Sequence, residues 1–253
     1  MDPTLTPGFQ VQELTYLSGI NHRLIGVNSL QPDVNIFGNR GSNLTFAVLT
    51  LNRSSLTIRL IESIIEHLPD FCGELLLGDN GSETKELENI YRYLERHSAL
   101  NSRIIEFGQN LGVAKGRNTL NTFVRTDWIC QLDNDMYFIS NPVDKIEADL
   151  EKLGCHFINI PVMNKNNNEA FLYGGNLYVE YLYNKLSIGG GTGYYSPKIA
   201  QFEEHEPFLC TFLCGGASIF NKHTFFSCGG YDERMFVGFE DTDFSIRLFQ
   251  KGY

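Results

Sequence analysis

The stretch Trp128-Ile129-Cys130-Gln131-Leu132-Asp133-Asn134-Asp135 decides the fold class. Its large apolar residues follow a polar turn at Thr126 and Asp127, which is typical of a buried strand, and it ends in two carboxylates one residue apart. Open α/β sheets bind ligands at the carboxyl edge of their strands, so we expect the pair at such an edge. Adjacent carboxylates repel each other unless a cation lies between them, and a hard divalent cation prefers oxygen ligands. The alternative is a surface turn, because Asp and Asn are common turn residues.

The composition indicates a globular protein with room for one large or two modest domains. The chain has 253 residues and a formal net charge of −10, which argues against nucleic acid as a partner. No apolar run reaches the roughly 18 residues of a transmembrane helix, and Met1–Thr4 lacks the features of a signal peptide. We therefore expect a cytoplasmic protein. Peripheral association with the inner face of the membrane, through partners or missing regions, stays open.

Patterns typical of strands and helices alternate from residue 44 onward. The expected strands cover 44–50, 74–77, 103–107 and 128–132, and the expected helices cover 54–68, with Ser54 as N-cap, 87–94 and 113–124. This alternation with short connections predicts an α/β fold with a mixed, mainly parallel sheet covered on both faces. Beyond residue 155 we expect strands at 157–162 and 217–220, loops at 164–168 and 189–193, and a helix at 241–250.

Four polar clusters follow successive predicted elements. They are Thr50–Arg53, Asp79–Ser82, Asn110–Asn118 and the pair Asp133/Asp135. In a parallel sheet all four lie at the carboxyl edge, where they would form a site for a nucleotide diphosphate.

Each cluster offers a group suited to such a ligand. Asp79 can accept a hydrogen bond from a base N–H, and Lys115 and Arg117 supply positive charge for phosphate or base oxygens. A metal ion held by Asp135 would neutralise the diphosphate. The alternatives are an ordinary turn at Asp79–Ser82 and a surface ion pair at Arg117.

A fifth segment, Gly229–Phe244, leads from a glycine turn through aromatic residues to Glu240 and Asp241 at the start of a predicted helix. The helix dipole favours acids in the first turn, so both residues could serve only to cap the helix. A carboxylate at a helix N-terminus beside a pocket can also act as the general base for a hydroxyl.

The order of these motifs resembles inverting glycosyltransferase family 2, with the GT-A fold. The matching motifs are Thr-x-Asn-Arg, Asp-Asn-Gly-Ser, Asn-x-Gly-x-x-x-Gly-Arg-Asn, Asp-x-Asp, and Gly-Gly-Tyr-Asp-Glu followed by Glu-Asp-x-Asp-Phe-x-x-Arg. The resemblance covers roughly residues 44 to 253. It implies a catalytic domain at 43–253, with a nucleotide-sugar half at about 43–140 and an acceptor half at about 141–253. Residues 1–42 would form an N-terminal extension or linker.

The resemblance also implies roles for individual residues. Asp241 would be the catalytic base, Asp135 would coordinate Mn²⁺ or Mg²⁺, and Asp133 would approach both the ribose and the metal. Gly215, Gly216 and Glu240 would lie where the acceptor and the donor sugar bind. The nucleotide-binding set would be Thr50, Asn52, Arg53, Asp79, Asn110, Lys115, Arg117, Asn118, Asp133 and Asn134.

The implied reaction moves a sugar from a nucleotide diphosphate sugar, with UDP favoured, to a hydroxyl of a glycan or lipid-linked acceptor, as in bacterial glycan biosynthesis. Aromatic residues between 171 and 195 either stack on sugars or pack in the core. Many relatives carry a metal-binding His beyond the last helix, and neither His205 nor His223 matches it. We therefore expect a further C-terminal region after Tyr253.

Two other classes of function remain to be weighed. A sugar-1-phosphate nucleotidyltransferase shares the α/β core, but it needs a Gly-rich loop after the first strand, where this chain has Asn52–Ser55 without glycine. A catalytically inactive sugar-nucleotide or glycan-binding module would not need the acids Asp133, Asp135 and Asp241, all of which are present. A retaining mechanism fits the Glu240-Asp241 pair less well than inversion.

Overall fold

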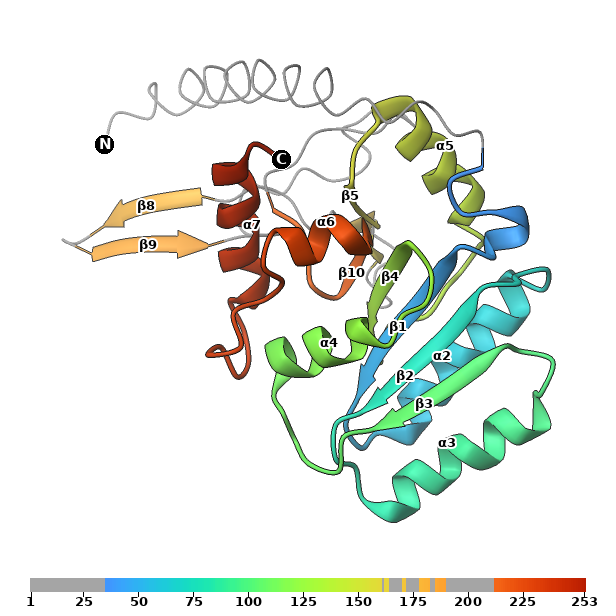
Figure 1. Ribbon diagram of the computed structural model, residues 1–253. Coiled ribbons are helices and arrows are strands. Elements are labelled where there is room, and N and C mark those ends of the chain that lie inside the picture. The colour runs from blue at the N-terminus through green and yellow to red at the C-terminus, as the bar shows by residue number, and fades with distance from the viewer. Residues whose placement is uncertain (1–34, 161, 164–169, 172–177, 183–184, 190–211) are drawn as a thin grey trace.

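A mixed six-stranded sheet forms the centre of the computed structural model, which describes residues 35–160, 162–163, 170–171, 178–182, 185–189 and 212–253 (Figure 1). The strand order is β3-β2-β1-β4-β10-β5. Strands β3, β2, β1 and β4 run parallel, whereas β10 runs antiparallel to both β4 and β5. The bounds are β1 Leu44–Thr50, β2 Glu74–Asp79, β3 Ser102–Glu106, β4 Trp128–Asp133, β5 Phe157–Asn159 and β10 Ala217–Asn221. The prediction of a mixed, mainly parallel sheet is confirmed.

Helices cover both faces of this sheet, as the alternating sequence pattern predicts. One apolar core joins the sheet to α2, α3 and α5, and a second core joins its other face to α4, α6 and α7. Strand β1 contributes to both, because Phe46 and Val48 point into the first core and Ala47 into the second. The bounds are α2 Ser54–His67, α3 Thr84–Arg96, α4 Val113–Thr122, α5 Val143–Leu153, α6 Lys222–Ser227 and α7 Glu240–Lys251.

Several local predictions need correction. The strand expected at 157–162 is two separate strands, β5 and the short β6 (Val162–Met163), which pairs with β7 (Ala170–Phe171). Ser54 is the first residue of α2 rather than its N-cap, which is Arg53 in a left-handed conformation. Helices α5 and α6 were not predicted, although Val143, Ile146 and Leu150 bury one face of α5 at helical spacing.

Other predictions fall largely outside the described residues. The loop expected at 164–168 lies there, as do most of 189–193 and most of the aromatic stretch 171–195. Within that stretch, β8 (Tyr178–Leu182) and β9 (Lys185–Gly189) form an antiparallel pair.

Of the predicted extension 1–42, the part from residue 35 onward is described, and it packs on the domain. It contains the 3-10 turn η1 (Asn39–Gly41) and the fully buried Phe37, whose ring meets Trp128 edge to face at 5.8 Å. Each helix among the described residues is too short or too polar to span a bilayer.

The strand register brings the polar strand ends together. Thr50 lies opposite Asp79 in the β1–β2 pair, and Leu49 lies opposite Asp133 in the β1–β4 pair. The carboxyl ends of three central strands therefore meet along one edge of the sheet, where the sequence places its polar clusters.

Candidate active site

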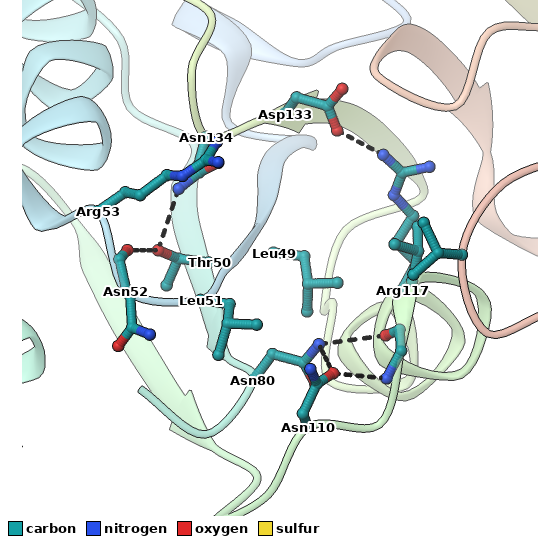
Figure 2. A pocket seen from close by; sticks show the side chains of 13 residues that line it. Leu49, Thr50, Leu51, Asn52, Arg53, Asn80, Asn110, Arg117, Asp133 and Asn134 are labelled. Atoms are coloured by element: carbon teal, nitrogen blue, oxygen red, sulfur yellow. Dashed lines mark hydrogen bonds and ion pairs between the residues drawn. The ribbon is translucent and has the colours of Figure 1, made fainter. Parts of the chain in front are cut away.

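A cavity of about 450 Å³ lies at this carboxyl edge (Figure 2). Its volume is in the range usual for small-molecule sites, roughly 300–1,000 Å³. It is lined by the end of β1, the β1–α2 loop, the turn after β2, the loop between β3 and α4, the first half of α4, the end of β4 and one residue from the loop before α7. The lining residues are Leu49, Thr50, Leu51, Asn52, Arg53, Asn80, Asn110, Gly112, Val113, Arg117, Asp133, Asn134 and Val237.

Arg117 links this cavity to the start of α7. The side chain is 7% exposed, its Nη2 donates to Asp133 Oδ1 at 2.5 Å, and its Nη1 donates to Glu240 Oε1 at 3.0 Å. Although burial opposes its charge, Asp133 and Glu240 hold the pKa of Arg117 above its ordinary value. The alternative of a surface ion pair at Arg117 does not hold, because the guanidinium is buried between two carboxylates.

Glu240 is the more desolvated partner of this arginine. Burial raises its pKa, while the nearby Arg117 acts in the opposite direction. Its Oε1 is bonded to Arg117, and its buried Oε2 has no hydrogen-bond partner among the described residues. Loss of Arg117 would leave this carboxylate buried without a counter-charge.

Gly215 and Gly216 allow these side chains to lie directly against the backbone. A Cβ on Gly216 would be 2.2 Å from Asp133 Oδ2, and a Cβ on Gly215 would be 2.3 Å from Arg117 Nη1. The space that side chains would need here is thus filled by the protein's own charged groups. Close approach to Asp133 and Arg117 is sufficient to explain the glycine pair.

Asp241 lies in the first turn of α7 and is half-buried. Its Oδ1 accepts from the Thr242 N–H at 2.7 Å, and its Oδ2 accepts from the Gly215 N–H at 3.3 Å. The residue before this turn, Phe239, has a φ of 67°, a left-handed conformation that is rare for an aromatic residue. The Asp241 carboxylate therefore contacts the same Gly215–Gly216 segment that lies against Arg117 and Asp133.

The β1–α2 loop has two consecutive non-glycine residues in the left-handed region, Asn52 with φ 55° and Arg53 with φ 53°. The strain is offset by bonds to the start of α3: the Asn52 N–H donates to Ser82 Oγ at 2.7 Å, and Asn52 Oδ1 accepts from the Glu83 N–H at 2.9 Å. The side chain of Asn52 thus supports the loop while the residue lines the cavity.

Asn80, which the sequence analysis did not single out, bonds the loop between β3 and α4 that forms another wall of the cavity. Its Nδ2 donates to Asn110 Oδ1 at 3.0 Å, and its Oδ1 accepts from the Leu111 N–H at 2.9 Å. The only sequence signal was its place in the Asp79–Ser82 turn. Asp79 itself is not a lining residue; its carboxylate accepts from the N–H groups of Gly81 and Ser82.

Two other predicted ligand residues also lie off the cavity wall. Lys115 is exposed on α4. Asn118 is buried and bonds both backbone groups of Tyr231, donating to its carbonyl at 2.8 Å and accepting from its N–H at 2.9 Å. Asn118 thereby fixes the 229–239 segment onto α4.

The Asp-x-Asp segment leaves β4 with its three side chains in different settings. Asp133 faces Arg117, while the Asn134 amide donates to Thr57 Oγ1 at 3.2 Å and contacts Thr50. Asp135 is exposed. No cluster of three His, Cys, Asp or Glu side chains suited to a metal occurs within the described part of the chain. The two carboxylates of Asp133 and Asp135 fit a hard divalent cation such as Mg²⁺. Such an ion often binds only one or two protein carboxylates and completes its coordination shell with water and substrate phosphate.

Solved structures with the same fold include several glycosyltransferases. GalNAc-T7, solved with UDP, GalNAc and Mn²⁺, is 17% identical with a TM-score of 0.63, over 82% of this chain and 40% of that one. A mannosyltransferase from Pyrobaculum calidifontis, solved with GDP-Man and Mn²⁺, is 16% identical with a TM-score of 0.59, over 95% and 63%. S. aureus TarS 1-349 is 15% identical with a TM-score of 0.56, over 82% and 55%. The aligned parts thus span between 40% and 63% of these proteins.

No curated protein matches the sequence. The sequence model of the family described as Glycosyl transferase family 2 matches residues 45–220, which is well over half of the chain. With the fold described above, this match shows that the chain belongs to glycosyl transferase family 2 and has the GT-A fold.

Proposed function

We propose that this chain is the catalytic domain of a metal-dependent, inverting glycosyltransferase. It would move a sugar from a nucleotide diphosphate sugar, with UDP favoured, to a hydroxyl of a glycan or lipid-linked saccharide. One observation carries the proposal: Arg117 bonds Asp133 at the cavity and Glu240 beside Asp241. One buried side chain would therefore join the proposed donor site to Glu240, the neighbour of the proposed base.

The donor assignment rests on the cavity and on what its neighbours bind. Among the neighbours, GalNAc-T7 and TarS have been solved with UDP, and the mannosyltransferase with GDP-Man. In this chain Thr50, Asn52 and Arg53 would surround the base and ribose, with Asp79 shaping the adjoining turn. Asn110, Arg117 and Asn134 would line the rest of the nucleotide, Lys115 would add positive charge nearby, and Asn118 would support α4.

A divalent ion, Mn²⁺ or Mg²⁺, would be held by Asp135 together with Asp133. When bound, it would neutralise the diphosphate and make it a better leaving group. Asp133 already shares one carboxylate oxygen with Arg117. We therefore assign the main share of metal binding to the exposed Asp135 and the orientation of the donor to Asp133.

Asp241 would act as the base. Its carboxylate would take the proton from the acceptor hydroxyl as that oxygen attacks the anomeric carbon, and the bond to the diphosphate would break on the opposite face. Glu240, Gly215 and Gly216 lie beside Asp241 and would border the acceptor and the donor sugar. Attack from the face opposite the leaving group inverts the anomeric centre.

The decisive experiment is product analysis after turnover. The chain is incubated with Mn²⁺, a panel of UDP-, dTDP- and GDP-sugars, and simple saccharide acceptors, and the anomeric configuration of any product is read by NMR. The proposal predicts inversion relative to the donor. Retention would remove the base role of Asp241, and absence of transfer with every donor would contradict the catalytic assignment.

A further inference from the structure

Gln131 is a buried amide between the apolar residues Cys130 and Leu132 of strand β4. It is 2% exposed, and both ends of its amide are bonded. Its Nε2 donates to the Gly215 carbonyl at 2.8 Å and to Tyr231 Oη at 2.9 Å, and its Oε1 accepts from Asn121 Nδ2 at 3.2 Å. Burial of an amide is costly unless its groups are paired, so this residue is retained with a specific set of partners.

The partners of Gln131 are themselves buried. Asn121 belongs to α4 and is fully buried, and its Oδ1 has no hydrogen-bond partner among the described residues. Tyr231 is buried, and both of its backbone groups are bonded to Asn118. Because a carbonyl oxygen can only accept, the Gly215 carbonyl requires the Nε2 end of the Gln131 amide, and this fixes the orientation of the amide. Its Nε2 therefore holds the Gly215 carbonyl in a defined place.

The N–H of Gly215, which lies on the other side of its Cα from the carbonyl, in turn contacts the start of α7. Gly215 lies in a turn before β10, so no regular strand or helix fixes its own carbonyl. Its N–H donates to Asp241 Oδ2, and Arg117 Nη1 lies against its Cα. A line of hydrogen bonds thus runs from α4 through Gln131 and Gly215 to the carboxylate of Asp241.

We propose that Gln131 is a positioning residue for Asp241. It acts through Gly215, whose carbonyl it holds so that the N–H on the other side of the same Cα faces the carboxylate, and it touches neither the donor nor the acceptor. The inference rests on the proposed role of Asp241 as the base. The inference adds that a residue of the central sheet, two positions before Asp133, fixes the position of the Asp241 carboxylate.

The first test measures hydrogen exchange of the Gly215 amide by NMR, which requires no substrate. Gln131→Met keeps the size of the side chain and removes its donors, so exchange at Gly215 should accelerate by about tenfold or more while the amides of β1 keep their protection. The matched control is Thr45→Val, which removes the bond between Oγ1 of the buried Thr45 and Oγ1 of the half-buried Thr126, at 2.8 Å, near the amino end of the same sheet. It should leave Gly215 unchanged.

A second variant keeps the test informative if Gln131→Met does not fold. Gln131→Glu retains an acceptor for Asn121 but places an oxygen against the Gly215 carbonyl, and it should loosen the same amide. Unchanged exchange at Gly215 in the folded variants would overturn the inference. Equal acceleration across the whole sheet would overturn it as well, because that pattern describes a general loss of stability.

The second test is a double-mutant cycle with Asp241→Asn. The readout is release of UDP or GDP from UDP-glucose, UDP-N-acetylgalactosamine and GDP-mannose, with Mn²⁺ and water as acceptor. Gln131→Met alone should lower kcat by about ten- to a hundredfold with KM nearly unchanged, because a small displacement of a catalytic group is costly. In the Asp241→Asn background it should cost nothing further, whereas a purely structural role gives additive losses.

The two proposals fail in different ways. Full activity of Asp241→Asn would remove the base assignment, and the exchange data would still decide whether Gln131 holds Gly215. Loss of activity in Asp241→Asn together with wild-type kcat in Gln131→Met would remove only the positioning role.

Discussion

Arg117 is the residue whose environment differs most from a simple reading of the sequence. A charged residue on an amphipathic helix usually faces solvent, yet this guanidinium is buried between Asp133 and Glu240. Its fork geometry lets one side chain bond two carboxylates that come from different elements. Its neighbours in α4 have contacts of their own: a Cβ on Gly116 would lie 2.9 Å from the Leu49 side chain, and Asn118 bonds the backbone of Tyr231.

Replacement of Arg117 should therefore be costly. Arg117→Met leaves two carboxylates, one of them buried, without a counter-charge and should lower the free energy of unfolding by about 3–5 kcal/mol. Arg117→Lys keeps the charge without the fork and should lose less. Urea unfolding measures both.

A matched control is Arg92→Met, which breaks the exposed pair with Glu88 at 2.7 Å and should cost about 0.5 kcal/mol or less. Equal losses in Arg92→Met and Arg117→Met would mean that the bridge between the cavity and α7 contributes no more than a surface pair.

Asp232 gives a prediction about pH. Hydrogen bonds from the Arg234 side chain and N–H hold the pKa of this carboxyl at about 2, below its ordinary value of 3.8. Because the folded pKa is depressed, the stabilisation is present above the ordinary value and is lost as the pH falls towards 2. An NMR titration of the Asp232 carboxyl carbon should show this midpoint, and Arg234→Gln should move it upward; an unchanged midpoint would contradict the assignment.

At the scale of the elements, the sequence predicted the parallel half of the sheet well. Strand β1 has the predicted bounds, and the bounds of β2, β3 and β4 differ from the prediction by one or two residues. The agreement is close because each strand is a short apolar run that ends at a polar turn, which marks where the strand ends. Strand β10 runs antiparallel to β4, and this direction could not be predicted because the apolar pattern of a strand does not encode which way the strand runs. Helix α6 follows β10 directly and has only six residues, too few for a periodic signal.

The candidate site was predictable in part for the same reason. Residues that end a strand, such as Thr50 and Asp133, line the cavity as expected. Residues whose side chains turn inward, such as Asn118 and Asp79, instead bond the backbone of the protein. Gln131 and Asn80 were missed because one amide in a strand or turn carries no spacing signal.

The loop before α7 supports a prediction about backbone strain. Phe239 has a φ of 67° and is 68% exposed, so it combines an unfavourable conformation with little packing. Phe239→Asn should raise the free energy of unfolding by about 1 kcal/mol, because Asn tolerates the left-handed region. Urea unfolding gives the value. Phe236→Asn, on the same loop without positive φ, should give no such gain, and equal effects of the two changes would contradict the strain argument.

At the scale of the whole molecule, the residues proposed for the donor and those proposed for the acceptor lie at adjoining strands of the sheet. The parallel strands β2, β1 and β4 end at the cavity, and the antiparallel β10 follows the Gly215–Gly216 turn that contacts Asp241. Arg117 and Gln131 connect these two parts through buried polar bonds. If these two parts have the proposed roles, single mutations should be able to affect nucleotide binding and sugar transfer separately.

That separation can be measured with two variants. Asp241→Asn should keep metal-dependent nucleotide affinity while kcat falls by about two to four orders of magnitude, because a lost base affects the transition state more than donor binding. Isothermal titration with UDP and Mn²⁺, set beside donor turnover, measures both quantities. Normal turnover in Asp241→Asn would show that another group takes the proton.

The most direct test of the central claim is a thermal-shift panel of UDP, dTDP and GDP, each with and without Mn²⁺, on this chain and on Asp135→Ala. The account predicts that the melting temperature rises with at least one nucleotide, that the rise requires Mn²⁺, and that Asp135→Ala abolishes it. No rise with any nucleotide, or an equal rise in Asp135→Ala, would contradict a metal-dependent nucleotide-sugar site at the carboxyl edge of the sheet.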